Sequence, residues 1–414
     1  MATNTLLTIE MITRELAYCL ENELMFGKAV ARGYDDKFAQ TGAKIGDTVK
    51  LRMPNVFYAA DGANFVQQDY TEANVSLQLA YRKHVGFSFT TQDMTLSLDD
   101  YSKRTLKPAA IALRNKIDSD IAAAAAAAAY HAVGTPGTTP GAASGNGIAN
   151  TGGVQIMTNA GMLLDHSAAP RGEDRHMIQN PTGMAGLSAT LSGMYNDRAS
   201  ISQIYKDGSM RGTHLGFNIG MDQNIETYTS GTRANGTVDG ANQTGATLDI
   251  IGAGNAATIT VGDRFTIADV YQLNPVNQKN TGQLQQFVVT TLATMDANGA
   301  NTISISPSIV VGASNVANGT VNALPANGAA LTWVANASTA TVNNLAFHKD
   351  AIVLATADLD LPDSAVSKSR INNNGIALRV IKYYDGSNDI ENCRVDVLYG
   401  IAIRRPEHLV VVNG

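Results

Sequence analysis

The chain has 414 residues and is 44% hydrophobic, enough for two or three domains with sizeable cores. Its net charge is −6, which argues against strong sequence-independent binding of nucleic acid, because such binding needs an excess of Lys and Arg. Cys19 and Cys393 are the two cysteines, a pattern typical of a reduced cytosolic protein, and the sequence leaves open whether they pair. Neither a basic leader nor an apolar run of about 20 residues is found, so no secretion signal or membrane span is predicted.

The first element expected is an amphipathic helix over residues 6–32. Its apolar residues recur at spacings of three and four and share one face: Ile9, Ile12, Leu16, Leu20 and Leu24. Gly33 is a suitable end for this helix. A terminal helix of this kind packs on its own domain or reaches a neighbouring subunit.

Residues 43–94 predict a long β-hairpin. Val49, Leu51 and Met53 alternate with polar residues, and a second alternating run begins at Val75. The tip between these runs carries four aromatic residues, namely Phe57, Tyr58, Phe65 and Tyr70. Such a tip must pack on something, either its own domain or another subunit.

Residues 98–133 give the strongest helical pattern, with Ser97 and Asp100 resembling a capping box. An apolar stripe precedes a run of eight alanines at 122–129; the stripe consists of Ala110, Leu113, Ile117 and Ile121. Pro108 should kink or divide this helix, and Gly134 should end it. The whole span would be about 50 Å long, so it can act as a structural backbone.

A Gly- and Thr-rich loop at 134–152 leads to two helices, near 153–167 and 181–195, that flank a strand at 175–180. Near the end of the chain, a strand at 376–384 and a turn at 385–389 predict a second hairpin. Its returning strand turns Cys393, Val395, Val397 and Tyr399 to one face and Arg394 and Asp396 to the other.

Between these segments lies a charge-poor stretch. Residues 297–347 contain no Asp, Glu, Lys or Arg, and Ser230–Leu345 contains eight: Arg233, Asp239, Asp249, Asp263, Arg264, Asp269, Lys279 and Asp296. Short Val/Ile/Thr runs alternate there with Gly, Asn and Asp turns, which predicts an inserted all-β barrel or sandwich.

No catalytic or metal signature emerges. Gly252–Ala257 matches a dinucleotide fingerprint in form, but strand-like residues follow it, so a β-turn is expected. His166, His176 and Asp165 could hold a metal, although ordinary histidines are the better interpretation. A loop with Asp358, Asp360 and Asp363 could hold a cation, but it lacks the glycine and terminal glutamate of an EF-hand. We therefore predict no cofactor, no metal and no enzymatic activity.

The C-terminal segment carries a family resemblance. Cys393–Gly400, then Arg404-Arg405-Pro406-Glu407 and the apolar strand Leu409–Val412, resemble the end of the coat protein of short-tailed, lambdoid-type bacteriophages. Within this motif the residues similar to the family are Arg394, Tyr399, Gly400, Arg405, Pro406 and Glu407. Phe347–Ile352 and Gly262–Ile267 are similar to further parts of the same family.

The resemblance implies an α+β, HK97-like capsid fold with an inserted β-barrel. The implied division is an N-terminal arm (1–42), an E-loop hairpin (43–94), a P-domain spine helix and loop (95–152), an A-domain in two parts (153–228 and 346–414, the second with the closing P-domain strands) and the inserted barrel (229–345). Candidates for contacts between subunits are Phe57, Tyr58, Asp61, Phe65, Tyr70, Arg52 and Arg82.

The resemblance also implies the partners. Copies of the chain would form hexamers and pentamers in an icosahedral shell, assembled in the host cytoplasm on a separate scaffolding protein, with a portal protein at one vertex. The shell would enclose double-stranded DNA without sequence-specific binding and would contact no membrane. The resemblance leaves open whether a decoration protein also binds. The alternative is a phage tail or surface adhesion protein with a glycan-binding β domain, which an exposed aromatic platform in the insert would favour.

Overall fold

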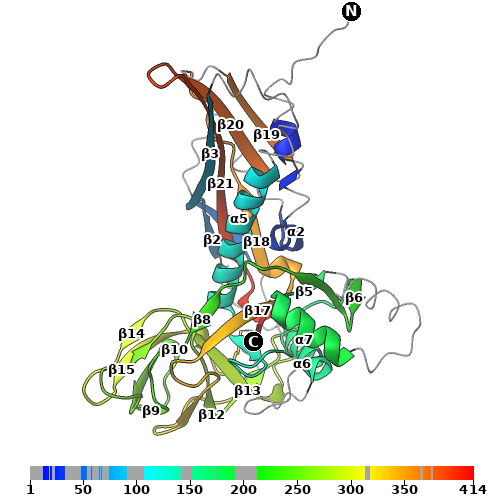
Figure 1. Ribbon diagram of the computed structural model, residues 1–414. Coiled ribbons are helices and arrows are strands. Elements are labelled where there is room, and N and C mark those ends of the chain that lie inside the picture. Colours follow the sequence, from blue (N-terminus) through cyan, green and yellow to red (C-terminus); the bar gives the residue numbers. More distant parts are fainter. Residues whose placement is uncertain are drawn as a thin grey trace, which may run out of the picture. The chain divides into compact units, whose positions relative to one another are not determined.

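The computed structural model is an α+β protein (Figure 1). It describes residues 13–17, 19–20, 24–32, 48–53, 57, 65, 67, 74–90, 107–140, 152–172, 174–191, 212–312, 318–363, 367–373 and 376–414. The chain divides into two compact units. Unit 1 comprises Met1–Arg52, Asn74–Ile121 and Ile352–Arg404, and unit 2 comprises Met53–Ala73, Ala122–Ala351 and Arg405–Gly414.

A five-stranded antiparallel sheet forms the centre of unit 1. Its strands are β3 (Tyr81–Thr90), β18 (Ile352–Thr356), β19 (Ser367–Asn373), β20 (Ile376–Asp385) and β21 (Ile390–Ile403). The long β21 pairs with β20 on one side and with β3 and then β18 on the other. This confirms the predicted closing hairpin of β20 and β21, and it shows that β3, which the sequence placed in the first hairpin, pairs with the closing strand.

A smaller hairpin lies against this sheet. β1 (Thr48–Arg52) and β2 (Asn74–Gln78) pair antiparallel, as the alternating pattern predicted. Their buried side chains pack with those of β18 and β21 in one apolar cluster: Val49, Leu51, Leu77, Val353, Ala355 and Ala402. The cluster anchors the hairpin base, while most of the predicted tip lies outside the described residues.

The predicted single helix at the N-terminus is wrong in its continuity. Residues 13–17 and 19–20 are helical, but Leu24 and Met25 are not, and the short helix α2 (Phe26–Ala29) follows them. The buried Asp118 carboxylate accepts hydrogen bonds from the backbone N–H groups of Met25 and Gly27, both at 3.0 Å. These bonds satisfy donors at a helix start, which explains why a new helix begins here. Ile9, Ile12 and Gly33 lie outside the described residues.

The long helix is α5 (Lys107–Ala128), and its predicted apolar stripe is buried. Pro108 lies at the start of the described part of this helix, and residues 98–106 lie outside the described residues, so the kink or division expected at Pro108 stays a prediction. The predicted helical end at residue 133 is wrong, because His131–Val133 forms strand β4, parallel to β22 (Leu409–Asn413). Ser97 and Asp100 lie outside the described residues.

Unit 2 contains a second sheet, in the order β4-β22-β17-β5-β7-β6. Its remaining strands are β5 (Arg175–Gln179), β6 (Gly212–His214), β7 (Phe217–Met221) and β17 (Ala340–His348), and β8 (Thr227–Thr229) also pairs with β17. Helices α6 (Gly153–His166) and α7 (Pro181–Leu191) pack on this sheet with a shared apolar core. The structure confirms both predicted helices and the strand between them.

The predicted all-β insert is a closed barrel, in the order β10-β15-β13-β12-β16-β9. The strands are β9 (Gly236–Val238), β10 (Gly245–Ile251), β12 (Arg264–Leu273), β13 (Asn280–Val289), β15 (Asn301–Ile309) and β16 (Ala330–Trp333), and β11 (Thr258–Ile259) pairs with β14 (Ala293–Thr294) beside them. Phe265, Phe287 and Trp333 fill its core, so these aromatics form no exposed platform for a glycan. Gly252 and Gly254 have positive φ and lead into β11, as expected of a turn.

Candidate assembly surfaces and buried charge clusters

The residues predicted to make contacts between subunits belong to both units of the chain. Phe57 is 57% exposed and Phe65 is 91% exposed, and both belong to unit 2. Arg52 on β1 and Arg82 on β3 are exposed in unit 1. Tyr58, Asp61 and Tyr70 lie outside the described residues. The described candidates therefore belong to two different units, and their role as contacts stays a prediction.

Phe57 lines a groove of about 540 Å³ in unit 2. The barrel contributes apolar residues to its lining, among them Leu273, Pro275, Val276 and Pro307, together with several polar ones. The C-terminal motif residues Arg405, Pro406 and Glu407 also line the groove. The groove therefore offers both apolar area and charge to a docking segment.

Tyr399 and Gly400 hold unit 1 together. The Tyr399 hydroxyl donates a 2.5 Å hydrogen bond to Asp120 on α5, and its ring stacks on Tyr81 at 5.4 Å between centroids. Burial, together with Asp120, raises the pKa of Tyr399 well above its usual value. A Cβ on Gly400 would lie 2.3 Å from the Gln78 carbonyl oxygen, so only glycine allows this close approach.

Arg394 belongs to a buried ion cluster. Asp396 is fully buried and accepts 2.7 Å hydrogen bonds from Arg394 and from Arg379 on the neighbouring strand. Burial by itself would raise the pKa of Asp396, but the two guanidinium groups outweigh it and hold that pKa below its usual range. Sequence reasoning placed Arg394 and Asp396 on one face but missed Arg379, whose role depends on strand register.

The Arg405-Pro406-Glu407 segment forms a tight turn. Pro406 begins a 3₁₀ helix, η3 (Pro406–His408), and β22 follows directly. The Arg405 guanidinium lies 3.3 Å from a Glu407 carboxylate oxygen, while the Arg405 N–H donates to the Ala351 carbonyl. Burial raises the pKa of Glu407. The motif therefore positions the last strand of the sheet in unit 2.

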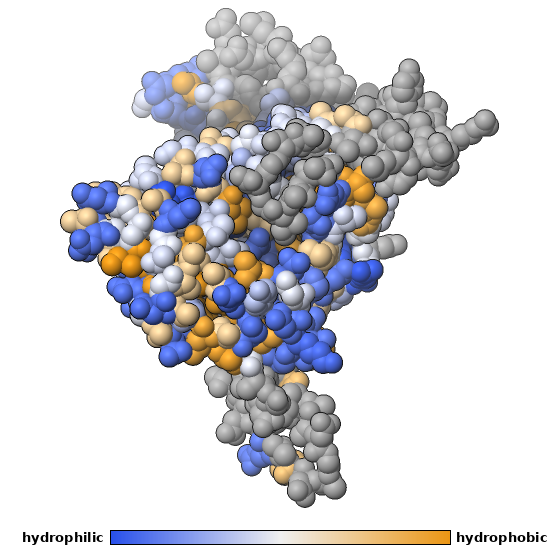
Figure 2. Space-filling model, turned by 90° about the horizontal axis from the view of Figure 1, so that it is seen from below, coloured by the Kyte–Doolittle hydropathy of each residue, from blue (hydrophilic) through white to orange (hydrophobic). Residues whose placement is uncertain are grey.

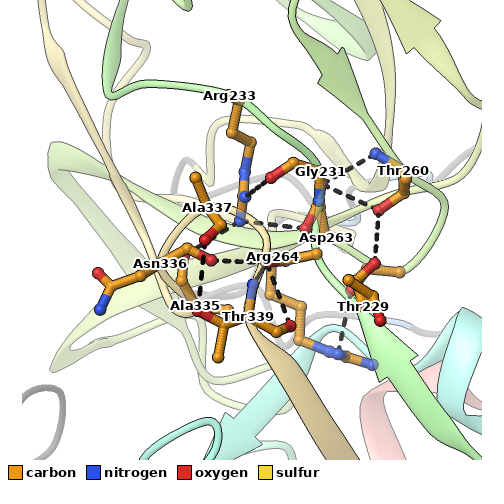
Figure 3. Close-up of polar contacts among 12 residues, drawn as sticks. Thr229, Gly231, Arg233, Thr260, Asp263, Arg264, Ala335, Asn336, Ala337 and Thr339 are labelled. Atoms are coloured by element: carbon orange, nitrogen blue, oxygen red, sulfur yellow. Dashed lines mark hydrogen bonds and ion pairs between the residues drawn. The ribbon is translucent and has the colours of Figure 1, made fainter.

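Asp263 is the centre of a buried network where the chain enters and leaves the barrel (Figure 3). One carboxylate oxygen lies 3.0 Å from the Arg233 guanidinium and accepts a 2.8 Å bond from the Tyr228 hydroxyl. The other accepts bonds from the N–H groups of Gly231 and Thr260. The Arg233 guanidinium also stacks on Trp333, 4.2 Å from the ring centroid. The segment that enters the barrel is thus tied to the barrel core.

Arg264 links the barrel to the end of α5. Its guanidinium donates to the carbonyls of Ala126 and Ala129, the second at 2.8 Å, and to that of Gly262 at 3.0 Å. These acceptors at α5 lie where a helix has unpaired carbonyls and partial negative charge. Burial lowers the pKa of Arg264 to about 10, so the group is still charged at neutral pH.

Sequence reasoning missed the role of these residues. The available signal was their isolation, because Arg233, Asp263 and Arg264 are three of the eight charges in a stretch of otherwise uncharged residues. Charges of this kind are costly to bury unless they are paired.

Three histidines are buried in unit 2: His348, and the two with the larger pKa shifts, His131 and His408. His131 is 1% exposed, with its Nε2 atom 2.9 Å from the Ser167 hydroxyl, and His408 is 5% exposed. Neither Nδ1 atom has a hydrogen-bond partner. Burial lowers the pKa of His131 to about 3 and that of His408 to about 4.

Acid should therefore destabilise the protein. Below about pH 6.5 the unfolded chain protonates both histidines while the folded chain does not, so stability present above pH 6.5 is lost as the pH falls towards 4, by up to about 1.4 kcal/mol per pH unit for each histidine. The raised pKa of Glu407 opposes this trend. Urea unfolding at pH 7.5 and 5 measures the loss, and His131→Gln should reduce it. The control is His84→Gln, a matched change at an exposed histidine. If both variants lost the same stability between pH 7.5 and 5, His131 would not be a source of the acid sensitivity.

The weaker metal candidates have other partners. Asp165 pairs with Arg171 and Arg175, and the His176 ring contacts Phe347. Asp363 pairs with Lys368, and the Asp360 carboxylate accepts the Leu361 N–H. Over the described residues, no group of three or more His, Cys, Asp or Glu side chains could hold a metal ion. None of the helices in the described part of the chain is long and apolar enough to cross a membrane.

Comparison with known families decides the assignment. A family model described as P22 coat protein, gene protein 5, matches residues 1–412. The chain belongs to the P22 coat protein family. It is a structural major capsid protein of a bacteriophage, and its place is the virion capsid. Family membership confirms the recognised resemblance and with it the HK97-like α+β capsid fold.

Solved phage capsid structures are similar to this coat protein over most of its length. A structure titled Mycobacterium phage Che8 is 13% identical with a TM-score of 0.48 and covers 94% of this chain and 91% of its own. The mature capsid of bacteriophage PhiM1 is 10% identical with a TM-score of 0.45, over 94% of this chain and 86% of its own. The capsid of cyanophage P-SCSP1u is 12% identical with a TM-score of 0.42, over 94% and 87%. No curated protein matches the sequence significantly.

Proposed function

We propose that this coat protein assembles into a closed icosahedral shell of hexamers and pentamers around double-stranded DNA. It has no enzymatic role in this proposal, assembles in the host cytoplasm on a scaffolding protein and meets a portal protein at one vertex. The family match over residues 1–412 carries the proposal. The surface agrees with the proposal. On the face in Figure 2, hydrophobic side chains form small patches among polar ones, which suits a subunit that makes many modest contacts with its neighbours.

Electron microscopy tests the proposal directly. The purified chain, with and without its scaffolding protein, should give closed shells or capsomer-sized rings in negative stain. A small, uniform oligomer that never forms shells, even with scaffold, would contradict it. Glycan binding by such an oligomer would then favour the adhesion function.

The division into an arm, E-loop, P-domain, A-domain and insert belongs to this proposal. The strands β1 and β2 lie within the E-loop range 43–94, and α5 lies within 95–152. The barrel strands lie within 229–345. We assign the barrel the role of stabilising the subunit, because it closes on itself and Asp263 ties the segment that enters it to the barrel.

The hairpin segment that carries Phe57 and Phe65 is proposed to dock between subunits. Phe65 is almost wholly exposed, and large apolar surface of this kind costs free energy until it is covered. The groove shows how such a side chain can be covered, because Phe57 lines it together with Val276 and Glu407. The groove of a neighbouring copy presents the same surface to the segment.

Changing both Phe57 and Phe65 to Ser should block shell assembly and leave a folded monomer. Both side chains are exposed, so their loss should change the free energy of unfolding by less than about 0.5 kcal/mol. Sedimentation and negative-stain microscopy measure assembly, and circular dichroism measures folding. The matched control is Leu292→Ser, which removes a 65% exposed side chain from the barrel. Normal shells from the double variant would refute the docking.

A further inference from the structure

The turn between β6 and β7 holds an unusual residue. His214 pairs with Phe217, so the loop has two residues, Leu215 and Gly216, with φ of 50° and 83°. Two-residue turns with positive φ at both positions favour Asn-Gly or Asp-Gly, because a bulky side chain is strained in this conformation. A leucine in place of asparagine is therefore an outlier that needs a reason.

The strained Leu215 is only partly buried within the chain. The Leu215 side chain is 41% exposed, so much of its apolar area still faces solvent. The turn itself is well held, since the Thr213 hydroxyl donates a 2.7 Å hydrogen bond to the Asn218 side-chain oxygen. Sparsely populated backbone conformations of this kind persist mainly where function uses them.

A hollow of about 610 Å³ lies beside this turn, with Leu215 on its wall. Outward residues of α6 form the other wall, among them Thr158, Gly161 and Met162. Charged residues line the hollow as well, because Asp165 pairs there with the exposed Arg171 and the buried Arg175. The lining thus combines apolar and charged side chains, as protein interfaces do, and methionine adapts well to a partner.

We propose that Leu215 and the hollow beside α6 form a contact surface for a second copy of this chain. An apolar side chain of the neighbouring copy enters between Leu215 and Met162, and the Arg171–Asp165 pair surrounds the contact. The inference rests on the proposed shell assembly, in which copies of the chain cover one another. Burial of the Leu215 side chain at that contact compensates for its backbone strain and for its exposure in the single chain.

The variant Leu215→Asn separates strain from contact. Asparagine suits the left-handed conformation, so the folding equilibrium constant of the monomer should rise about fivefold. The lost apolar contact should raise the protein concentration needed for shell assembly about tenfold. Urea unfolding of the monomer and light scattering during assembly measure the two effects. A more stable monomer that assembles less well is the expected result.

The control is Ala256→Gly, which relieves a positive φ of 51° at an exposed turn of the barrel. It should stabilise the monomer and leave the assembly concentration unchanged. A Leu215→Asn monomer that is less stable would show that Leu215 packs within its own chain, which overturns the inference. An unchanged assembly concentration would also overturn it. Failure of the wild-type chain to form shells would instead contradict the proposed function.

Discussion

Replacing Asp263 by alanine should lower the free energy of unfolding by about 3–5 kcal/mol, the cost of leaving a buried charge without its partner. Arg233 is 3% exposed, and its ion pair with Asp263 is the carboxylate contact that compensates its burial. The same substitution removes the acceptor for the Tyr228 hydroxyl and for two backbone N–H groups. Urea unfolding, monitored by the fluorescence of Trp333, measures the loss of stability. Trp333 lies against Arg233 and therefore reports on the altered network.

Two further variants show whether the ion pair is responsible. Asp239→Ala removes an exposed acid from the same barrel and should change the free energy of unfolding by no more than about 0.5 kcal/mol. Adding Arg233→Met to Asp263→Ala should recover much of the loss, because removing both partners leaves no buried charge. A loss below about 1 kcal/mol in Asp263→Ala would contradict the role given to the network.

Local patterns predicted the elements that depend on one face being buried. The stripe from Ala110 to Ile121 and the alternation of Val49 and Leu51 each follow the period of their element, so periodicity alone identified them. The barrel was predicted for the same reason, since short β-branched runs between turn residues have few other ways to bury themselves. The family resemblance at Tyr399-Gly400 added the class of protein.

Other features depend on partners that are distant in sequence. The helix at Phe26 begins where it does because Asp118, 91 residues away from Gly27, accepts its N–H groups. Alanine propensity extended the predicted helix through His131, but parallel pairing with β22 overrides it there. Neither the buried Arg379–Asp396 pair nor the contact of Arg264 with α5 leaves a local pattern, because both arise from the packing of separate elements.

Gly400→Ala should destabilise unit 1 by about 3 kcal/mol, at the upper end of what overpacking usually costs. The new Cβ would lie 2.3 Å from the Gln78 carbonyl oxygen and 2.9 Å from its carbon. These are backbone atoms at the end of β2, so no side-chain rotation can relieve the clash. The hairpin base must instead move away from β21, which should open the cluster of Val49, Leu51 and Leu77. Hydrogen exchange at β1 and β2, together with urea unfolding, measures this effect.

The same sheet supplies a matched control at Gly86 on β3. A Cβ there would meet nothing within 4 Å, so Gly86→Ala should be neutral or slightly stabilising, because alanine restricts the unfolded chain. Similar losses in both variants would show that the sheet simply disfavours alanine, and would contradict the close approach at Gly400. A loss of stability confined to Gly400→Ala would explain physically why the family motif has glycine after tyrosine. The tyrosine ties β21 to α5 through Asp120, and the glycine admits the base of the hairpin on which assembly is proposed to depend.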